Sequence, residues 1–155
     1  MEIRPIRPEE VALALPLFAG YQRFYEVDEP DDGANLAFFT RFCEPSDDGL
    51  LLGAWVGDDL VGFATLYWTF SSTRAVDAAL MNDLFVADRA RGKGVGRALI
   101  AAAADAARAR GCHHLEWYTA PDNATAQRVY DATGAHRTEW VCYEIPLAGE
   151  TPPVL

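Results

Sequence analysis

The feature that most constrains the fold is a glycine-rich hexapeptide, Arg91-Gly92-Lys93-Gly94-Val95-Gly96, which lies between two segments of different character. Residues 78–86, before it, form an apolar run typical of a strand. Residues 95–110, after it, are rich in alanine and followed by Gly111, a pattern typical of a helix and its end. A glycine bend between a strand and a helix presents free backbone N–H groups at the helix N-terminus. The hexapeptide therefore predicts an α/β domain with an anion-binding bend.

Two common nucleotide-binding patterns do not fit this hexapeptide. A dinucleotide fingerprint, G-x-G-x-x-G, would need a third glycine where the chain has Arg97 or Leu99. A Walker A loop needs Ser or Thr after Gly-Lys, whereas Gly94 follows Lys93. Neither of these two nucleotide-binding motifs is present.

The pattern along the rest of the chain predicts a mixed α/β domain. Turn residues and apolar periodicity divide it into a strand near Ile3 and Ile6, helices over 8–27 and 35–43, a hairpin of 50–56 and 60–70, a strand over 112–118, a helix from Asp122 or Asn123 to Gly134, and a last strand over 139–145. Strands at both ends, with helical crossovers in the second half, are typical of this class. We expect one domain over residues 1–147 and a peripheral tail over 148–155.

Composition restricts the location and the kind of partner. No apolar run approaches the roughly 20 residues that span a bilayer, and the N-terminus lacks a signal-peptide core, so we expect a cytoplasmic protein without membrane contact. The net charge of −10 argues against nucleic-acid binding and favours cationic small molecules. Four of the thirteen Lys and Arg residues nevertheless lie between Arg89 and Arg97, where an anion should dock.

The cysteines and histidines do not predict a metal site. The cysteines Cys43, Cys112 and Cys142 are odd in number and widely spaced, which argues against both a disulfide framework and a zinc site. The three histidines lack ligand spacing with acidic or cysteine partners. We expect reduced thiols and no metal.

Two motifs resemble those of the GNAT superfamily of N-acetyltransferases. Arg91, Gly94 and Gly96 match the pattern R/Q-x-x-G-x-G/A, and Asn123, Ala126 and Tyr130 match N-x-x-A-x-x-x-Y. Two motifs in the expected order are more specific than one. The resemblance implies the acyl-CoA N-acyltransferase fold, a mixed, mainly antiparallel sheet of six to seven strands flanked by about four helices.

The same resemblance implies that acetyl-CoA is the cosubstrate. The implied cofactor-binding residues are Leu84, Phe85, Val86, Arg91, Gly92, Lys93, Gly94, Val95, Gly96, Arg97, Asn123, Ala126 and Tyr130. The backbone amides from Arg91 to Gly96 would hold the pyrophosphate of acetyl-CoA, and Asn123 would contact its pantetheine arm. Tyr130, which shares a helical stripe with Asn123, would lie near the sulfur and protonate the departing thiolate as general acid.

The general base is less defined. An alkyl ammonium group must lose a proton before its nitrogen becomes nucleophilic. Polyamine-acetylating relatives often carry Glu at the position where this chain has Asn82. The amide side chain of Asn82 cannot act as a base. Asp83 is the leading candidate because it borders the glycine bend, while Glu116 and a water chain stay as alternatives.

The acceptor is also inferred from resemblance. The pattern Tyr21-x-x-Phe24-Tyr25-Glu26 and the ending 140–144 look like the histone-and-polyamine acetyltransferase branch. The substrate-binding residues that we expect are Tyr21, Tyr25, Glu26 and Asn82. Their acidic surroundings favour a polyamine-like or lysine-like primary amine. The amine would attack acetyl-CoA directly in a ternary complex, because neither motif contains a cysteine.

Two other functions stay open at this stage. One is acetylation, with the same chemistry, of a protein or peptide at lysine or at the N-terminus, of an amino acid, or of an antibiotic amine. The other is a catalytically idle CoA-binding module. Homodimers are common in the superfamily, so a homodimer also stays open.

Overall fold

The computed structural model describes residues 1–147, which divide into two compact units, residues 1–118 and 119 onward. The first unit contains, in chain order, β1 (Glu2–Pro5), η1 (Pro8–Glu10), α1 (Val11–Phe24), α2 (Asp32–Thr40), β2 (Gly49–Val56), β3 (Asp59–Ser71), β4 (Val76–Val86), η2 (Asp88–Ala90), α3 (Val95–Ala109) and β5 (Leu115–Glu116). The second unit contains α4 (Ala124–Asp131). The tail predicted over 148–155 lies outside the described residues. No helix within residues 1–147 is long and apolar enough to cross a membrane.

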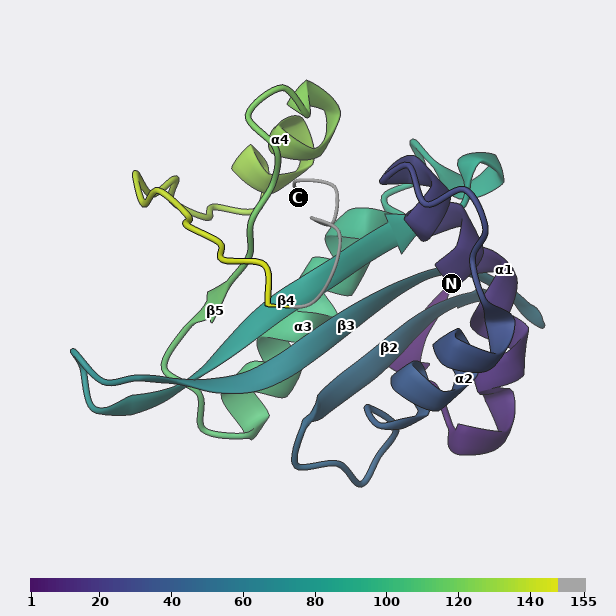
Figure 1. Cartoon of the computed structure of the whole chain (residues 1–155), viewed down its shortest axis with the longest axis horizontal. Coiled ribbons are helices and arrows are strands. Elements are labelled where there is room, and N and C mark those ends of the chain that lie inside the picture. The colour runs from purple at the N-terminus through teal and green to yellow at the C-terminus, as the bar shows by residue number, and fades with distance from the viewer. Residues whose placement is uncertain (148–155) are drawn as a thin grey trace. The chain divides into compact units, whose positions relative to one another are not determined.

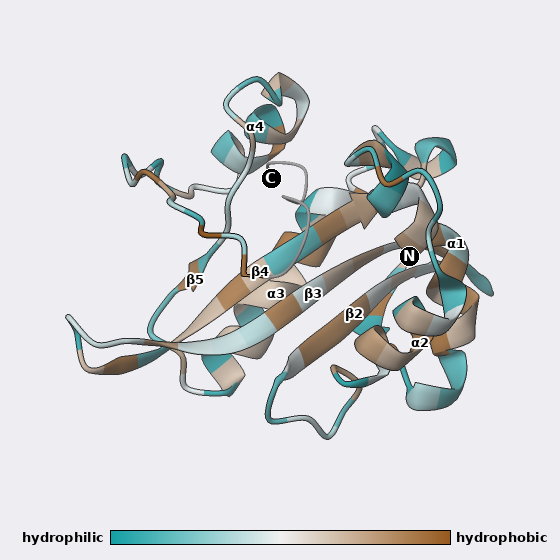
Figure 2. Cartoon of the chain, viewed as in Figure 1, coloured by the Kyte–Doolittle hydropathy of each residue, from teal (hydrophilic) through white to brown (hydrophobic). Residues whose placement is uncertain are grey.

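One sheet with the order β1-β2-β3-β4-β5 forms the centre of the first unit (Figure 1). Neighbouring strands are antiparallel except for β4 and β5, which are parallel. Helices α1 and α2 lie on one face and α3 on the other (Figure 1). Because both faces are covered, β2 is apolar along almost its whole length instead of alternating (Figure 2).

The mixed α/β class and the mainly antiparallel sheet are confirmed, but the number of strands is corrected. The sheet has five strands rather than six to seven. The predicted last strand, residues 139–145, has no regular secondary structure, and Trp140 is 89% exposed. A strand requires a neighbour for its backbone hydrogen bonds, and the described part of the second unit holds no other strand that could supply one.

Helix α1 is fixed to the sheet and to α2 by close contacts. Phe18 of α1 stacks on Phe39 of α2 with ring centroids 3.7 Å apart and meets Phe63 of β3 edge-on at 4.9 Å. The side-chain amides of Gln22 and Asn35 exchange two hydrogen bonds of 2.8 and 2.9 Å. These contacts fix the position of α1 on the face of the sheet that carries Phe63.

A buried carboxylate joins the N-terminal strand to the start of α1. Arg4 donates two hydrogen bonds, of 2.8 and 2.9 Å, to the oxygens of Glu10, and Arg7 donates one of 2.6 Å. The backbone N–H of Arg7 also donates to Glu10, at 3.1 Å. The hydrogen bonds from Arg4 and then Arg7 hold the pKa of Glu10 far below its usual range, against the opposing effect of burial.

We predict that Glu10→Gln lowers the free energy of unfolding by about 1–3 kcal/mol at pH 7, because two guanidinium groups lose their carboxylate. A depressed pKa stabilises the fold above the pKa of the unfolded chain and stops doing so as pH falls through the folded value. The difference between variant and wild type should therefore shrink below about pH 4. Urea denaturation at several pH values measures it.

Glu9→Gln is the matched control. The Glu9 side chain is 67% exposed and forms one ion pair with Arg7, at 3.3 Å. Its loss should cost less than about 0.5 kcal/mol at any pH. Equal effects of the two substitutions would contradict the assigned role of Glu10.

Candidate active site

The glycine bend between β4 and α3 has the form that an anion site requires. Gly92 and Gly94 have φ angles of 74° and 81°, in the left-handed region that favours glycine. A Cβ atom added to either residue would meet no atom within 4 Å, so the space above the bend is open. Gly94 is the N-cap of α3, and no side chain caps this helix start. Its first-turn N–H groups are therefore left for a ligand.

Charged side chains around the bend are held by local contacts. Arg91 donates from Nε to the Val86 carbonyl at 3.1 Å and pairs with Asp88 at 2.8 Å. Lys93 donates from Nζ to the Arg89 carbonyl at 2.9 Å. The side chains of Arg91 and Lys93, two residues predicted to bind the cofactor, thus contact the bend itself.

An unpaired strand edge leads into the bend. Strand β4 pairs with β3 along its length, but with β5 only at Ala79↔Leu115 and Leu80↔Glu116. The other edge of residues 81–86 has no strand partner among the described residues. Leu84, Phe85 and Val86, all predicted to bind the cofactor, lie here and are half-buried. Their backbone can receive an extended ligand that carries amide groups.

A β-bulge marks the middle of β4. Thr65 of β3 is opposite Asp83, whereas the next residue, Leu66, is opposite Met81. Asn82 is therefore the extra residue, and it is exposed between two buried neighbours. Bulges change the direction of side chains next to active sites. Nothing in the sequence indicates this bulge, which places Met81 and Asp83 opposite consecutive residues of β3.

Asp83 is a buried carboxylate on the α1 side of the sheet. Its residue is only 5% exposed, and Asn82 Nδ2 donates to Asp83 Oδ1 at 3.0 Å. Burial raises the pKa of Asp83, and the Thr65 and Tyr21 hydroxyls together with the Asn82 amide offset part of this rise. An aspartate with a raised pKa can accept a proton closer to neutral pH than an exposed one.

Aromatic residues surround this carboxylate. Burial, followed by the charge of Asp83, raises the pKa of Tyr21 well above its usual range and that of Tyr67 to about 12. The rings of Tyr21 and Tyr25 meet edge-on with centroids 5.0 Å apart. Gly20 lets α1 approach β4, since a Cβ there would lie 3.0 Å from Phe85 Cζ.

Most of the predicted acceptor residues are thus brought together. Tyr21 and Asn82 lie at Asp83, and Tyr25 contacts the ring of Tyr21, while Glu26 lies just after α1, exposed, with a φ of 63°. Sequence reasoning missed Thr65 and Tyr67, which come from β3. A polar residue inside the apolar run 60–66 was the available signal for Thr65, but only the strand register places it opposite Asp83. Glu116, the alternative base, pairs with His114 at 3.6 Å.

The second unit contains the other motif. Asn123 is the N-cap of α4, and its Oδ1 accepts a hydrogen bond from the Ala126 N–H at 3.0 Å. Tyr130 is half-buried near the end of the same helix. The helix start predicted at Asp122 or Asn123 is confirmed, and the asparagine side chain already serves as the cap.

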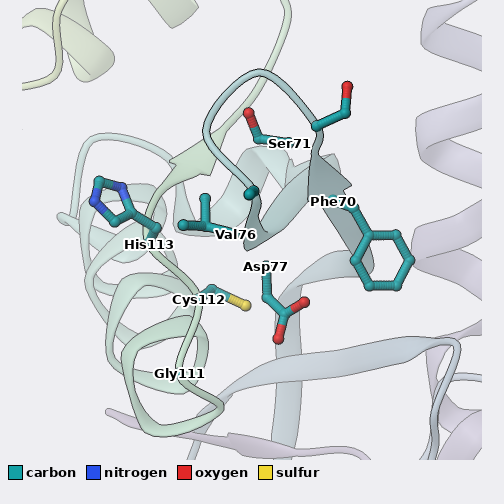
Figure 3. A pocket seen from close by; sticks show the side chains of 9 residues that line it. Phe70, Ser71, Val76, Asp77, Gly111, Cys112 and His113 are labelled. Carbon is teal, nitrogen blue, oxygen red and sulfur yellow. The ribbon is translucent and has the colours of Figure 1, made fainter.

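A cavity of about 800 Å³ lies away from the glycine bend. Phe70, Asp77, Cys112 and His113 are among its lining residues (Figure 3). It adjoins the start of β4, whereas the bend follows the end of this eleven-residue strand, which is roughly 35 Å long. The cavity is therefore separate from the candidate site. No cluster of three or more His, Cys, Asp or Glu side chains in the described part of the chain could hold a metal ion.

The chain is similar to acetyltransferases in sequence and in structure. The acetyltransferase (GNAT) family model matches residues 15–135. The chain is 35% identical over 134 residues to the uncharacterized N-acetyltransferase YhfO of Bacillus subtilis, covering 86% of this chain and 89% of that protein. It is 33% identical over 146 residues to the D-amino-acid N-acetyltransferase HPA3 of Saccharomyces cerevisiae, covering 92% and 88%.

A solved structure agrees with these matches. The crystal structure of a probable acetyltransferase superposes with a TM-score of 0.86 at 28% identity, covering 97% of this chain and all of that one (100%). The fold class expected from the two motifs is thereby confirmed. The histone-and-polyamine branch is not distinguished by these relatives. The chain belongs to the GNAT family and is an N-acetyltransferase.

Proposed function

We propose that this enzyme transfers the acetyl group of acetyl-CoA to a small primary amine, polyamine-like or lysine-like, by direct attack in a ternary complex. The observation that carries the proposal is the uncapped glycine bend at the start of α3, next to the unpaired edge of β4. Backbone N–H groups from Arg91 to Gly96 would bind the pyrophosphate. Leu84, Phe85 and Val86 would bind the amide-containing arm.

The positive charge at the bend supports this assignment. Arg97, in the first turn of α3, is exposed, and no hydrogen bond or ion pair joins its guanidinium to another side chain among residues 1–147. The rest of the chain is acidic, with a net charge of −10. A ligand with several phosphate groups would therefore bind best where N–H groups and Arg97 converge.

Proton transfer is assigned to two residues. An alkyl ammonium is about one part in a thousand neutral at pH 7, so a base must take its proton. Asp83 would accept that proton, directly or through a water molecule, before the neutral nitrogen attacks the thioester carbonyl. The second proton, which the nitrogen loses as the amide forms, would pass to solvent. Tyr130 would give its proton to the sulfur as the carbon–sulfur bond breaks.

The acceptor is assigned from charge and aromatic surface. Tyr21 lies beside Asp83, Tyr25 contacts Tyr21, and the loop that follows α1 carries Glu26, Asp28, Glu29 and Asp31. Aromatic faces and carboxylates attract an ammonium group. The second candidate acceptor is the α-amino group of an amino acid, which the relative that acetylates D-amino acids favours.

The reaction itself can be tested by following free-thiol release from acetyl-CoA with polyamines, lysine derivatives, D- and L-amino acids and short peptides. We expect the highest kcat/KM with diamines and polyamines, because two ammonium groups interact with the acidic loop. A preference for D-amino acids would establish the second candidate. A preference for peptides would indicate a protein acetyltransferase, and CoA binding without any turnover would indicate an idle module.

We predict that Gly94→Ala weakens coenzyme A binding by roughly ten- to a hundredfold, since the added methyl group occupies the open space and misaligns an N–H donor to a charged group. Titration calorimetry measures this affinity. Gly57→Ala is the matched control, because Gly57 also has a positive φ, 61°, and open space around it, but lies in the β2–β3 turn. The two variants should lose similar stability, and unchanged CoA affinity in Gly94→Ala would refute the bend as the phosphate site.

We predict that Tyr130→Phe lowers kcat by about a hundredfold or more, the usual contribution of a positioned acid, and leaves the affinity for acetyl-CoA nearly unchanged. Steady-state kinetics and calorimetry give the two quantities. Tyr143→Phe, in the same unit but 91% exposed, should retain full activity. If Tyr130→Phe also retained full kcat, the phenol would have no part in the mechanism.

A further inference from the structure

A buried threonine hydroxyl in β3 lacks a hydrogen-bond partner. Thr65 is 0% exposed, and among the described residues no atom is placed well enough to pair with its Oγ1. A buried polar group without a partner costs free energy, so nearly all such groups in folded proteins find one. The acceptor that satisfies this hydroxyl has to come from its immediate surroundings.

The register of the sheet identifies that acceptor. Thr65 and Asp83 are directly opposite on β3 and β4, at the step where the bulge begins. Residues opposite each other on antiparallel strands have Cβ atoms roughly 5 Å apart, within reach of a hydroxyl and a carboxylate. The Thr65 hydroxyl also lowers the pKa of Asp83, which burial raises.

The carboxylate therefore lies among polar groups from three neighbouring elements. Asn82 of β4 donates at 3.0 Å, and the hydroxyls of Tyr21 on α1 and Thr65 on β3 are near enough to lower the pKa that burial raises. The titratable groups that face Asp83 are Tyr21 and Tyr67. Tyr25 lies next to Tyr21. The one cation with an electrostatic effect on these side chains is Arg41, which lowers the pKa of Tyr67. Within the described structure, neutral donors rather than a cation stabilise the ionised form of Asp83.

We propose that Thr65 is a positioning residue for the general base. Its hydroxyl donates to one carboxylate oxygen of Asp83, favours the ionised form of the carboxylate and fixes its direction at the bulge. This role rests on the proposed function, in which Asp83 accepts the proton of the amine. Thr65 itself touches neither the amine nor acetyl-CoA in this proposal.

Thr65→Val tests the proposal, because it removes the hydroxyl and keeps the branched shape that suits a strand. The hydroxyl favours the ionised carboxylate, so its loss raises the pKa of Asp83. The acidic limb of the kcat/KM profile should then move up by about one pH unit, with roughly a tenfold loss of rate on that limb. The KM for acetyl-CoA should not change. Thr65→Ser should restore the wild-type profile, and Thr65→Ala serves if the valine variant does not fold.

Asp83→Asn separates this proposal from the base assignment. If Asp83→Asn loses the acidic limb and most of the rate while Thr65→Val leaves the limb in place, Asp83 is the base and the positioning role is wrong. If Asp83→Asn keeps the wild-type limb and rate, the base assignment fails and the role of Thr65 fails with it. A uniform loss of rate in Thr65→Val, without movement of the limb, would also overturn the proposal by showing a purely structural effect.

Discussion

The antiparallel pairing of β3 with β4 supports every part of the first unit that the proposed chemistry uses. Its ladder runs from Gly62↔Val86 to Ser71↔Val76. At one end it delivers the chain to the glycine bend, and in its middle it sets Thr65 opposite Asp83. Gly62 is needed for this pairing, since a Cβ there would lie 2.8 Å from the Phe85 carbonyl oxygen. A shift of this ladder by one residue would separate the carboxylate from its donors and move the bend together with α3.

Helix α1 completes the site by covering the sheet at the bulge. Its close approach at Gly20 and its contacts with α2 place Tyr21 over Asp83. The carboxylate is thereby withdrawn from water without a cationic partner among residues 1–147, which accounts for the raised pKa of Asp83. The first unit thus has two different electrostatic environments close together along the chain: exposed backbone N–H groups after Val86, and a shielded carboxylate before it.

The sequence predicted those features that depend on local chemistry. The glycine bend, the helix after it and the asparagine cap of α4 each follow from residues close together in the chain, and each is found where it was expected. Features that depend on distant pairing were not predictable. The bulge at Asn82 arises from the register of two strands. The pattern of residues 139–145 predicts a strand, but a strand forms only beside a neighbour, and these residues have no regular secondary structure. The side-chain contacts of Arg91 with the Val86 carbonyl and Asp88, and of Lys93 with the Arg89 carbonyl, likewise depend on the path of the bend.

Strand β5 pairs with β4 at only two positions, so this edge of the sheet should open more easily than the rest. Only Ala79 and Leu80 have partners in β5, assisted by the hydrogen bond from the His113 N–H to the Asp77 carbonyl at 2.8 Å. Cooperative units with few backbone hydrogen bonds open most easily, so β5 should separate from the sheet long before β3 does. One border of the unpaired edge of β4 can therefore widen by local fluctuation while the β3–β4 ladder around Asp83 stays closed.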